Sequence, residues 1–243
     1  MPTLASNPAL LRFGLTLALA ASAGIATAAA GCNALGGVSV PTVVELYTSE
    51  GCSSCPPADR WLASLKDQPG LVRLAFHVDY WDRLGWKDRF ADPAYTQRQQ
   101  AVSQRAGGRF VYTPQVVVDG ADWRGWPGLP RSAPRPTTVQ LTLVEDDTGY
   151  LARVVRGPGA PVRLAAFWAV TEDGHASQVK AGENAGAILR HDAVVREFVE
   201  VSAVGDAPLR FAPRSAAERG AQRHVRFVIT DAATGRPLQA ASC

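Results

Sequence analysis

Two closely spaced cysteines constrain this chain more than any other feature of its sequence. They stand in the stretch VVELYTSEGCSSCPPADRW, which runs from Val43 to Trp61. The β-branched, apolar run at 42–48 predicts a buried strand, whereas Pro56 and Pro57 fit only the first turn of a helix. Free N–H groups and partial positive charge at the start of a helix favour a thiolate over a thiol. The context therefore favours a redox-active pair, although a Cys-x-x-Cys also occurs in metal half-sites and inert disulfides.

The position of each cysteine predicts its role in thiol–disulfide exchange. Cys52 is expected just ahead of the helix and exposed, as the attacking nucleophile, whereas Cys55 is expected one turn in and shielded, as the resolving thiol. Glu45 is a carboxylate inside an otherwise apolar strand, and burial would raise its pKa. Glu45 is therefore a candidate proton relay for Cys55, unless its side chain faces solvent.

A threonine–proline pair supplies the second motif. Pro114 begins the stretch PQVVVDG, which predicts a strand over 114–120 that ends in a turn. An X-Pro bond in such a turn is a candidate cis peptide, and the backbone at Thr113 would be free to pair with an extended substrate. Thr113 and Pro114 therefore join the candidate catalytic residues, although a trans proline at a sheet edge is the alternative.

Aromatic residues follow the next predicted strand, at 71–78. Functional side chains gather at the carboxyl ends of the strands in an open α/β sheet, so this segment is expected on the side of the cysteines. Tyr80, Trp81 and Trp86 are candidates for a substrate-binding groove, with the core as the alternative. His77, at the end of the same strand, is either a satisfied core residue or a functional group.

A metal-binding alternative uses the same part of the chain. Cys52, Cys55 and His77 could bind a soft metal such as Cu(I), which would make the protein a metal chaperone. No second ligand pair with zinc-like spacing accompanies them, so structural zinc is not expected. The favoured interpretation requires no metal and no organic cofactor, because disulfide exchange needs only the two thiols.

Residues 43–120 resemble the thioredoxin superfamily in the strand before the cysteines, in Cys-Ser-Ser-Cys at a helix start, and in Thr-Pro before QVVVDG. This resemblance implies a thioredoxin-like α/β fold in which the proline is cis and faces the disulfide. The chain is also similar to exported bacterial proteins of domain-of-unknown-function family 1223, in the stretches ELYTSEGCSSCPPAD, HVDYWDRLGWKDRFADPAYTQRQ, VYTPQVVVDG and GENAGAILRHDAVVR. That resemblance implies a fold and no established substrate. Two features depart from the superfamily: a Pro-rich segment replaces the closing helix, and Glu45 lies one residue too far from the first cysteine.

The chain divides by composition into a leader and two segments. The leader carries a single charge, Arg12, followed by an apolar run and small residues, which predicts a secretory signal peptide over 1–30. The alternation of strands and helices that follows predicts an α/β domain over 31–126, which the resemblance above implies is thioredoxin-like. A Pro-rich segment at 127–137 is expected to be a linker, and the strand-like pattern beyond it predicts a β-rich, sandwich-like domain over 138–243.

Export to an oxidising compartment, periplasmic or secreted, changes the interpretation of the terminal cysteines. Disulfides persist there, and the four cysteines are an even number. Cys32 and Cys243 are therefore expected to form a structural disulfide between the two ends of the mature chain. The sequence AAGC at 29–32 weakly resembles a lipoprotein cleavage site, so a lipid anchor on Cys32 with a free Cys243 is the alternative.

The function predicted from these features is an exported thiol–disulfide oxidoreductase. Such a protein acts as an oxidase, reductase or isomerase on protein thiols or disulfides, together with a redox partner protein. The alternatives are the metal chaperone and a non-catalytic thioredoxin-like binding module. A net charge of +3 without a basic run gives no case for nucleic-acid binding. After the leader no apolar stretch reaches the length of about 18 residues that indicates a membrane span.

Overall fold

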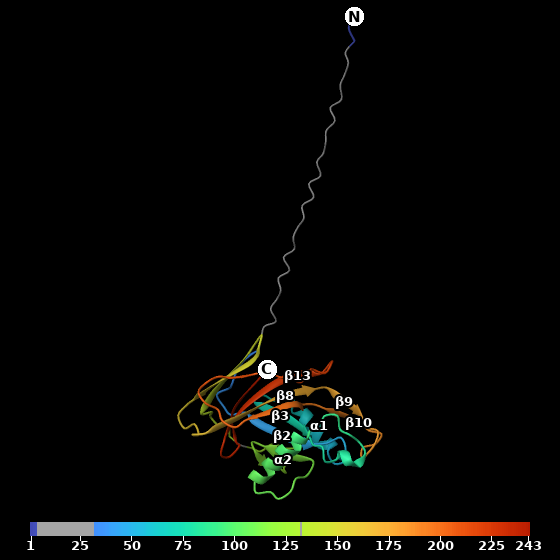
Figure 1. The fold of residues 1–243 in the computed structure, drawn as a ribbon, viewed down its shortest axis with the longest axis vertical. Helices are drawn as coiled ribbons and strands as arrows, with labels where there is room; N and C mark the ends of the chain where they lie inside the picture. Colours follow the sequence, from blue (N-terminus) through green and yellow to red (C-terminus); the bar gives the residue numbers. More distant parts are fainter. Residues whose placement is uncertain (4–31, 132) are drawn as a thin grey trace. The chain divides into compact units, whose positions relative to one another are not determined.

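A computed structural model describes residues 1–3, 32–131 and 133–243 (Figure 1). The signal peptide expected over 1–30 lies outside the described residues, except for 1–3. Contacts within the chain group Gly31–Cys243 into one compact unit. No helix in the described part of the chain is long and apolar enough to cross a membrane.

An eight-stranded sheet forms the centre of this unit (Figure 1). β2 runs parallel to β3 and antiparallel to β4. β11 joins β3 in parallel through one residue pair, Val194 with Ala75, so strands from both sides of the Pro-rich segment 127–137 share one sheet. In spatial order the strands are β14 (Pro237–Ser242), β13 (Gln222–Asp231), β8 (Leu164–Asp173), β11 (Val194–Val201), β3 (Leu71–His77), β2 (Thr42–Thr48), β4 (Gln115–Val118) and β5 (Ala121–Asp122).

A four-stranded antiparallel sheet packs against part of the large sheet. Leu141 and Leu143 of its strand β6 pack with Trp168 of β8 and Phe227 of β13 in one buried cluster. A separate two-stranded hairpin pairs β9 with β10. The four strands are β1 (Asn33–Leu35), β6 (Val139–Asp146), β7 (Gly149–Arg156) and β12 (Leu209–Phe211), and the hairpin strands are β9 (His175–Gln178) and β10 (Ile188–His191).

The two α-helices, α1 (Pro56–Ser64) and α2 (Pro93–Arg105), lie on opposite faces of β2. Successive side chains of a strand point to opposite faces of the sheet. Val44 of β2 therefore packs with Leu62 of α1, whereas Tyr47 packs with Tyr95 of α2. A 3-10 helix, η1 (Asp82–Leu84), lies between the two helices in the sequence. Each α-helix begins with a proline, which needs no N–H partner in the first turn.

The expected fold class, an α/β thioredoxin-like domain followed by a separate mainly-β domain, is wrong. The structure is mainly β: of the described residues, 40% lie in strands and 12% in helical conformation. The later strands do not form a sandwich of their own, because β11 continues the large sheet beside β3. At this junction Ala75 N donates to Ala193 O over 2.8 Å. The added strands cover an edge of β3 that would otherwise leave backbone groups without partners.

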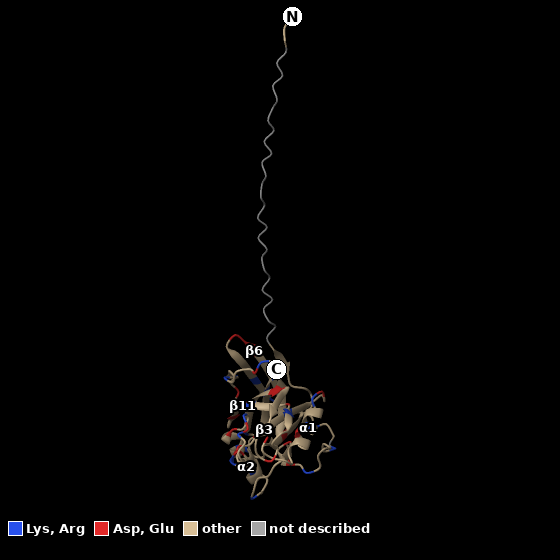
Figure 2. Ribbon diagram, turned by 90° about the vertical axis from the view of Figure 1, so that its right-hand side faces the viewer, with Lys and Arg blue, Asp and Glu red and all other residues tan. Residues whose placement is uncertain are grey.

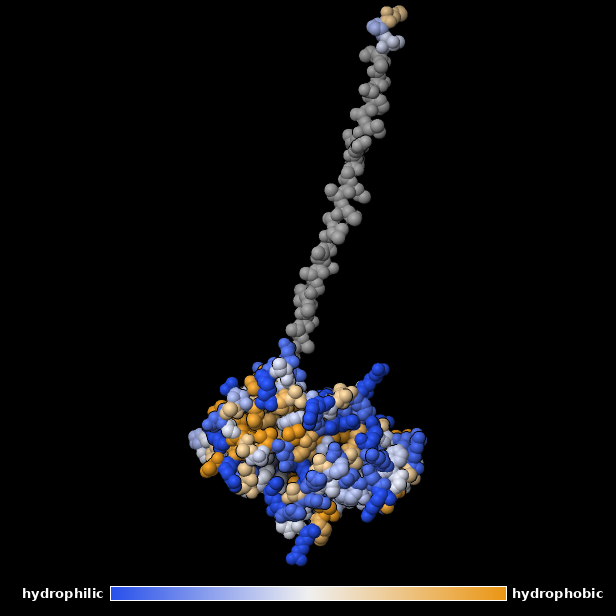
Figure 3. Space-filling model, viewed as in Figure 1, coloured by the Kyte–Doolittle hydropathy of each residue, from blue (hydrophilic) through white to orange (hydrophobic). Residues whose placement is uncertain are grey.

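Charged residues of both signs are interspersed along the ribbon (Figure 2). The face shown in Figure 3 also mixes hydrophilic and hydrophobic residues, with a larger hydrophobic area toward its left side. This mixture of signs agrees with the small net charge of the chain, +3.

Candidate functional site

Cys52 and Cys55 form a disulfide at the turn between β2 and α1, with 5.4 Å between their Cα atoms. Cys55 is the N-cap residue of α1, so the bond lies at the start of that helix. Both cysteines are 0% exposed. The expected exposure of Cys52 is therefore wrong, because side chains from distant parts of the chain cover it.

The turn that carries the disulfide is tight and closely packed. Cys52 N donates to Ser49 O, and Cys55 N donates to Cys52 O, each over 3.2 Å. Trp81 lies directly against this turn, because a Cβ on Gly51 would come within 3.0 Å of the Trp81 Cβ. Glycine at this position therefore lets the tryptophan approach the backbone.

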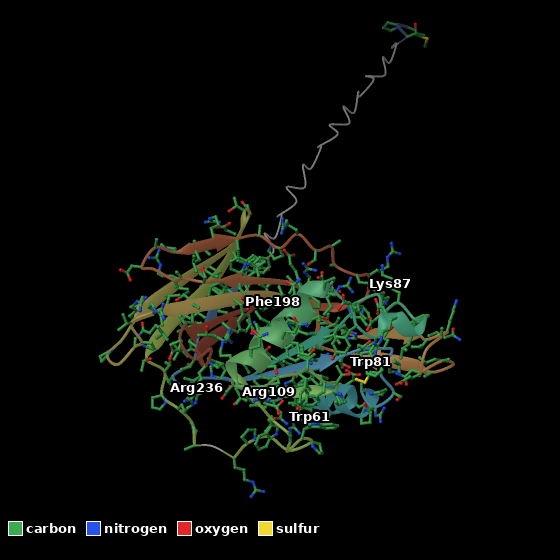
Figure 4. All side chains as sticks on the ribbon, turned by 60° about the horizontal axis from the view of Figure 1, so that its bottom comes forward. Trp61, Trp81, Lys87, Arg109, Phe198 and Arg236 are labelled. Atoms are coloured by element: carbon green, nitrogen blue, oxygen red, sulfur yellow. A yellow bond between two sulfur atoms is a disulfide. The ribbon has the colours of Figure 1, made fainter. Side chains whose placement is uncertain are left out.

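Thr113 places a hydroxyl group on the disulfide. Its Oγ1 donates to Cys52 Sγ over 3.3 Å, and Trp81 Nε1 donates to the same Oγ1 over 2.8 Å. In Figure 4 the labelled Trp81 lies next to the yellow sulfur–sulfur bond. The Thr113–Pro114 peptide is cis. The structure thus brings together three of the residues that the sequence proposes for the site, Cys52, Thr113 and Trp81.

Gln99 of α2 holds the segment that precedes Pro114. Its Nε2 donates to Tyr112 O over 2.8 Å, and its Oε1 accepts a hydrogen bond from Tyr80 OH at 3.3 Å. Tyr80, which the sequence proposes for a substrate groove, is half-buried and is directed to this glutamine. Tyr80 and Gln99 therefore brace the threonine–proline turn from the side of α2.

A loop between β9 and β10 also covers the cysteine motif. Glu183 Oε2 accepts hydrogen bonds from Ser53 N at 3.0 Å and from Ser53 Oγ at 2.8 Å. Asn184 Nδ2 donates to the backbone oxygens of Glu50 and Cys52, each over 2.9 Å. Glu183 is absent from the candidates that the sequence provides, whereas Asn184 stands out in the sequence only as a polar residue among glycines between two predicted strands. Their shared signal is their position in GENAGAILRHDAVVR, a stretch that carries part of the family resemblance.

A buried histidine–carboxylate pair adjoins the same turn. His77 Nδ1 lies 2.7 Å from Asp88 Oδ2, and this oxygen also accepts a hydrogen bond from Glu50 N at 2.9 Å. Burial lowers the pKa of His77, but the Asp88 carboxylate outweighs burial and raises it above the usual value. For Asp88 the effects have the opposite sign. Burial raises the pKa of this carboxyl, but His77 and two backbone N–H groups outweigh burial and lower the pKa to about 2. His77 is thus held in a buried pair, which is the structural alternative that the sequence left open.

Glu50 links this pair to the β9–β10 hairpin. Trp86 Nε1 donates to Glu50 Oε2 over 2.7 Å, and His191 Nε2 lies 3.3 Å from Glu50 Oε1. Burial raises the pKa of Glu50, but hydrogen bonding to His191 and other groups outweighs burial and lowers it. The rings of His77 and His191 are 4.9 Å apart between their centroids. Trp86, proposed for the substrate groove, therefore also supports the buried residues behind the cysteine turn.

Asp59 is a buried carboxylate on the same helix as Cys55. Residues four apart are neighbours on one face of a helix, and this spacing separates Cys55 from Asp59. Thr48 Oγ1 donates to Asp59 Oδ2 over 3.1 Å. Burial raises the pKa of Asp59, against the attraction of His191 and His77. Asp59 is absent from the candidates that the sequence provides, although a Cys-x-x-x-Asp spacing at a helix start is a usable signal.

Glu45 lies away from the disulfide. Its Oε1 forms an ion pair with Arg98 Nη2 of α2 at 2.7 Å, and its Oε2 accepts a hydrogen bond from Tyr47 OH at 2.8 Å. Because strand residues alternate between faces, Glu45 faces α2, whereas Cys55 begins the helix on the opposite face. The structure therefore does not bring Glu45 to the cysteines.

The described residues include one group with metal-like spacing, Glu172, His175 and Glu218. His175 lies 3.1 Å from Glu172 through Nε2 and 3.4 Å from Glu218 through Nδ1. The same two carboxylates contact three guanidinium groups, those of Arg89, Arg196 and Arg223. Three positive charges already compensate the two negative ones, so the group is an ion-pair network rather than a cation site.

Cys32 and Cys243 form the second disulfide, the pair that the sequence suggests, with 5.6 Å between Cα atoms. Cys243 exchanges two backbone hydrogen bonds of 2.8 Å with Val225 of β13. Cys32 O accepts a hydrogen bond from Glu145 N of β6 at 2.8 Å. The bond therefore ties the residue just before β1 to the residue just after β14, beside strands of both sheets.

A sequence profile described as "Protein of unknown function (DUF1223)" matches residues 43–230. The chain belongs to the DUF1223 family. The matched range includes the cysteine turn, the Thr-Pro segment and the loop that covers them. Outside this family profile, a search of the curated proteins found no match.

Two solved structures resemble this DUF1223 protein. The crystal structure of protein AGR_C_4864 from Agrobacterium tumefaciens is 24% identical and covers 84% of this chain and 93% of its own, with a TM-score of 0.58. HBP35 of Porphyromonas gingivalis is 15% identical and covers 86% of this chain and 76% of its own, with a TM-score of 0.57. At these identities both likenesses concern the fold alone.

Proposed function

We propose that this DUF1223 protein is an exported thiol–disulfide oxidoreductase that acts on protein thiols or disulfides. The observation that carries the proposal is the hydroxyl of Thr113, which donates to Cys52 Sγ of a Cys-x-x-Cys disulfide at the start of α1. A structural disulfide needs no polar group aimed at its sulfur. A sulfur that alternates between disulfide and thiolate gains from a donor, because hydrogen bonding to the charged form favours that form.

The exchange cycle uses both cysteines. In the reduced protein the Cys52 thiolate attacks one sulfur of a substrate disulfide, forms a mixed disulfide, and releases the other substrate sulfur as a thiolate. The Cys55 thiol then loses its proton and attacks Cys52 Sγ. The mixed disulfide breaks, the substrate leaves with two thiols, and the Cys52–Cys55 bond forms with the two electrons transferred to the substrate. The reverse sequence oxidises substrate thiols.

Asp59 supports the second half of this cycle as the group that accepts the Cys55 proton. It is buried, it lies one helical turn beyond Cys55, and burial raises its pKa, which makes its carboxylate a better proton acceptor. Glu45, the sequence-based candidate for this role, is engaged with Arg98 on the other face of β2. The acid of the site is therefore assigned to α1 rather than to β2.

Export is part of the proposal. The leader pattern at 1–30 supports it, and the Cys32–Cys243 disulfide is of the kind that persists in an oxidising compartment. In such a compartment, periplasmic or secreted, the protein needs a partner protein that restores the redox state of Cys52 and Cys55 after each cycle.

The reduction potential of the Cys52–Cys55 bond tests the proposal. The potential is measured in metal-free protein equilibrated with glutathione buffers, by alkylation of free thiols and mass spectrometry. A value near or above about −200 mV supports an exchange catalyst, and a value below about −300 mV indicates an inert structural bond and overturns the proposal. Tight 1:1 Cu(I) binding that is lost in His77→Ala, without exchange activity, would instead favour the metal chaperone.

A further inference from the structure

The disulfide of the proposed site is closed to solvent in the oxidised protein. Cys52 is 0% exposed, although the residues on its C-terminal side, Ser53 and Ser54, are exposed. A thiol can exchange with a disulfide only by reaching a sulfur atom along the sulfur–sulfur axis. Some part of the cover must therefore move before Cys52 can react.

The cover has two parts of different character. Trp81 and Thr113 are hydrogen-bonded to each other and are held from behind, with Thr113 next to the segment that Gln99 anchors. The loop at 182–187 is held over the motif by two exposed hydrogen bonds from Ser53 to Glu183. Asn184 adds two half-buried hydrogen bonds to backbone oxygens of the turn. The loop is the part that can be released without disturbing the core, because its Glu183 contacts are the most exposed ones of the cover.

Two glycines set the shape of the loop. Gly182 and Gly186 have positive φ angles of 74° and 87°, so the hairpin changes direction at both ends of the Glu183–Asn184 pair. Gly182 also packs on Trp86, since a Cβ at this position would lie 3.5 Å from the Trp86 Cβ. The loop is therefore short, has a defined conformation, and is held on the cysteine turn by the contacts of Glu183 and Asn184.

The contacts of Glu183 show which chemical group a partner polypeptide needs in order to replace Glu183 at Ser53. Both Ser53 donors, the backbone N–H and the hydroxyl, converge on one carboxylate oxygen. A partner that displaces Glu183 without a carboxylate leaves these donors to water and loses two charge-assisted hydrogen bonds. A partner with a carboxylate beside its own cysteine restores both bonds, so the exchange of one for the other costs little.

We propose that the loop at 182–187 is a displaceable latch that shields Cys52 from small thiols and yields to a polypeptide whose own carboxylate replaces Glu183 at Ser53. This inference rests on the proposed function and adds a substrate class, polypeptides with an acidic residue next to the reacting cysteine. When such a polypeptide reduces the site, its thiolate attacks Cys52 Sγ and the Cys52–Cys55 bond breaks. Cys55 leaves as a thiolate and takes up a proton, and a second thiol of the partner completes the two-electron reduction.

The first experiment measures access to the disulfide. Oxidised wild-type protein and Glu183→Gln are mixed with dithiothreitol in excess, and the free thiols of Cys52 and Cys55 are counted against time by rapid alkylation and mass spectrometry. We expect Glu183→Gln to be reduced about 5-fold faster or more, the factor that corresponds to the net loss of one ordinary hydrogen bond. Asp147→Asn, on the β6–β7 turn, makes the same change of charge outside the latch and should react as the wild type does. Equal rates for all three proteins would overturn the latch.

The second experiment measures partner selection. Three reduced peptides with two cysteines are compared as reductants: one with glutamate beside the first cysteine, one with the same glutamate at the far end, and one with glutamine instead. We expect the first peptide to react about 10-fold faster than the other two with wild-type protein. In Ser53→Ala, which lacks the hydroxyl donor, dithiothreitol should react faster while this preference shrinks. If the peptide with glutamate beside its cysteine and the peptide with glutamate at its far end reacted at the same rate, the proposed substrate class would be overturned. Any effect of the glutamate would then come from long-range attraction between the peptide and the protein.

These results separate the latch from the proposed function. The rate of reduction by dithiothreitol reports on access to the sulfur, whether or not the bond serves in catalysis. A faster Glu183→Gln together with the potential of an inert bond would keep the latch and overturn the oxidoreductase. An unchanged Glu183→Gln together with the potential of an exchange catalyst would do the opposite.

Discussion

The two disulfides of this protein join the same atoms in very different surroundings. Cys32 and Cys243 are 211 positions apart, and both lie in a network of backbone hydrogen bonds between strands. Cys52 and Cys55 are 3 positions apart, at the start of a helix, with a hydroxyl aimed at one sulfur and a buried carboxylate one turn away. In the chain-entropy model the long loop contributes about 5 kcal/mol of stability and the short one about 2 kcal/mol. The first bond is placed to hold the fold, and under the proposed function the second is the one that reacts.

The sharpest way to break this comparison is to remove the proposed nucleophile. Cys52→Ser should lower disulfide exchange by more than about 1,000-fold, since no attacking thiolate remains. Cys55→Ser should instead accumulate mixed disulfides with protein substrates, which non-reducing gels and mass spectrometry detect. The opposite pattern, with trapped partners only in Cys52→Ser, would reverse the roles of the two cysteines.

Removal of the other disulfide should affect stability and leave the chemistry intact. The double variant Cys32→Ser/Cys243→Ser should lose about 2–5 kcal/mol of unfolding free energy in denaturant titrations. Its exchange rate per folded molecule should equal that of the wild type, because no residue of the cysteine turn contacts this bond. If the exchange rate fell and stability were unchanged, the assignment of a structural role to Cys32–Cys243 and a reactive role to Cys52–Cys55 would be contradicted. A diacylglyceryl group on Cys32 in the mature protein would exclude the bond, since that sulfur would already be substituted.

The assigned proton acceptor predicts a smaller effect with a characteristic pH dependence. Asp59→Asn should slow the attack of Cys55 on the mixed disulfide by about 100-fold, the lower end of general-base effects. The carboxylate form accepts the proton, so the wild-type rate should rise as pH passes upward through the raised pKa of Asp59. This rise should be absent in Asp59→Asn. The release of the second thiol of an aromatic disulfide reagent, followed by absorbance, measures this step.

Glu45→Gln is the matched control for this prediction. It also neutralises a buried carboxylate, but one on the face of α2 that pairs with Arg98. The variant should lose stability and keep both the rate and its pH dependence. If Glu45→Gln removed the pH dependence and Asp59→Asn did not, the acid of the site would be the one that the sequence proposed.

The smallest expected effect concerns the hydroxyl on Cys52. Thr113→Val keeps the shape of the side chain and removes one of the two hydroxyl donors to Cys52 Sγ, the other being Ser54 Oγ at 3.4 Å. In the reduced protein this change should lower the thiolate fraction of Cys52, and alkylation by iodoacetamide near neutral pH should slow by about 5-fold. Cys55 is not contacted by Thr113, so its alkylation should stay the same. Equal slowing of both cysteines would indicate a general disturbance of the turn.

Much of the local structure follows from the sequence. The apolar runs at 42–48 and 71–78 predict β2 and β3, and the prolines at 56 and 93 mark the first residues of both helices. These signals are local, because strand propensity and the missing N–H of proline act over a few residues. The third predicted strand, 114–120, is shorter in the structure, where β4 covers Gln115–Val118 and a turn takes the rest.

Part of the candidate site also follows from the sequence. The pairing of Cys52 with Cys55 and the approach of Thr113 to them rest on motifs that lie within the quoted stretches. The choice between Glu45 and Asp59 as the acid near Cys55 does not follow from the sequence, because a strand presents alternate residues to opposite faces. Which face meets α1 depends on how the helix packs, and a shift of one position reverses the answer.

The sequence by itself determined the cysteine turn, the helix starts and the chemistry that a dithiol can perform. Only the tertiary structure decided that the later strands join the first sheet through Val194 and Ala75, and that Glu183 reaches Ser53 across 130 positions. Backbone hydrogen bonds between strands are the same for every residue type, so a local pattern does not specify which edges meet. The cover of Cys52 depends on that long-range pairing, because β9 and β10 lie between β8 and β11, the strands that extend the large sheet beside β3.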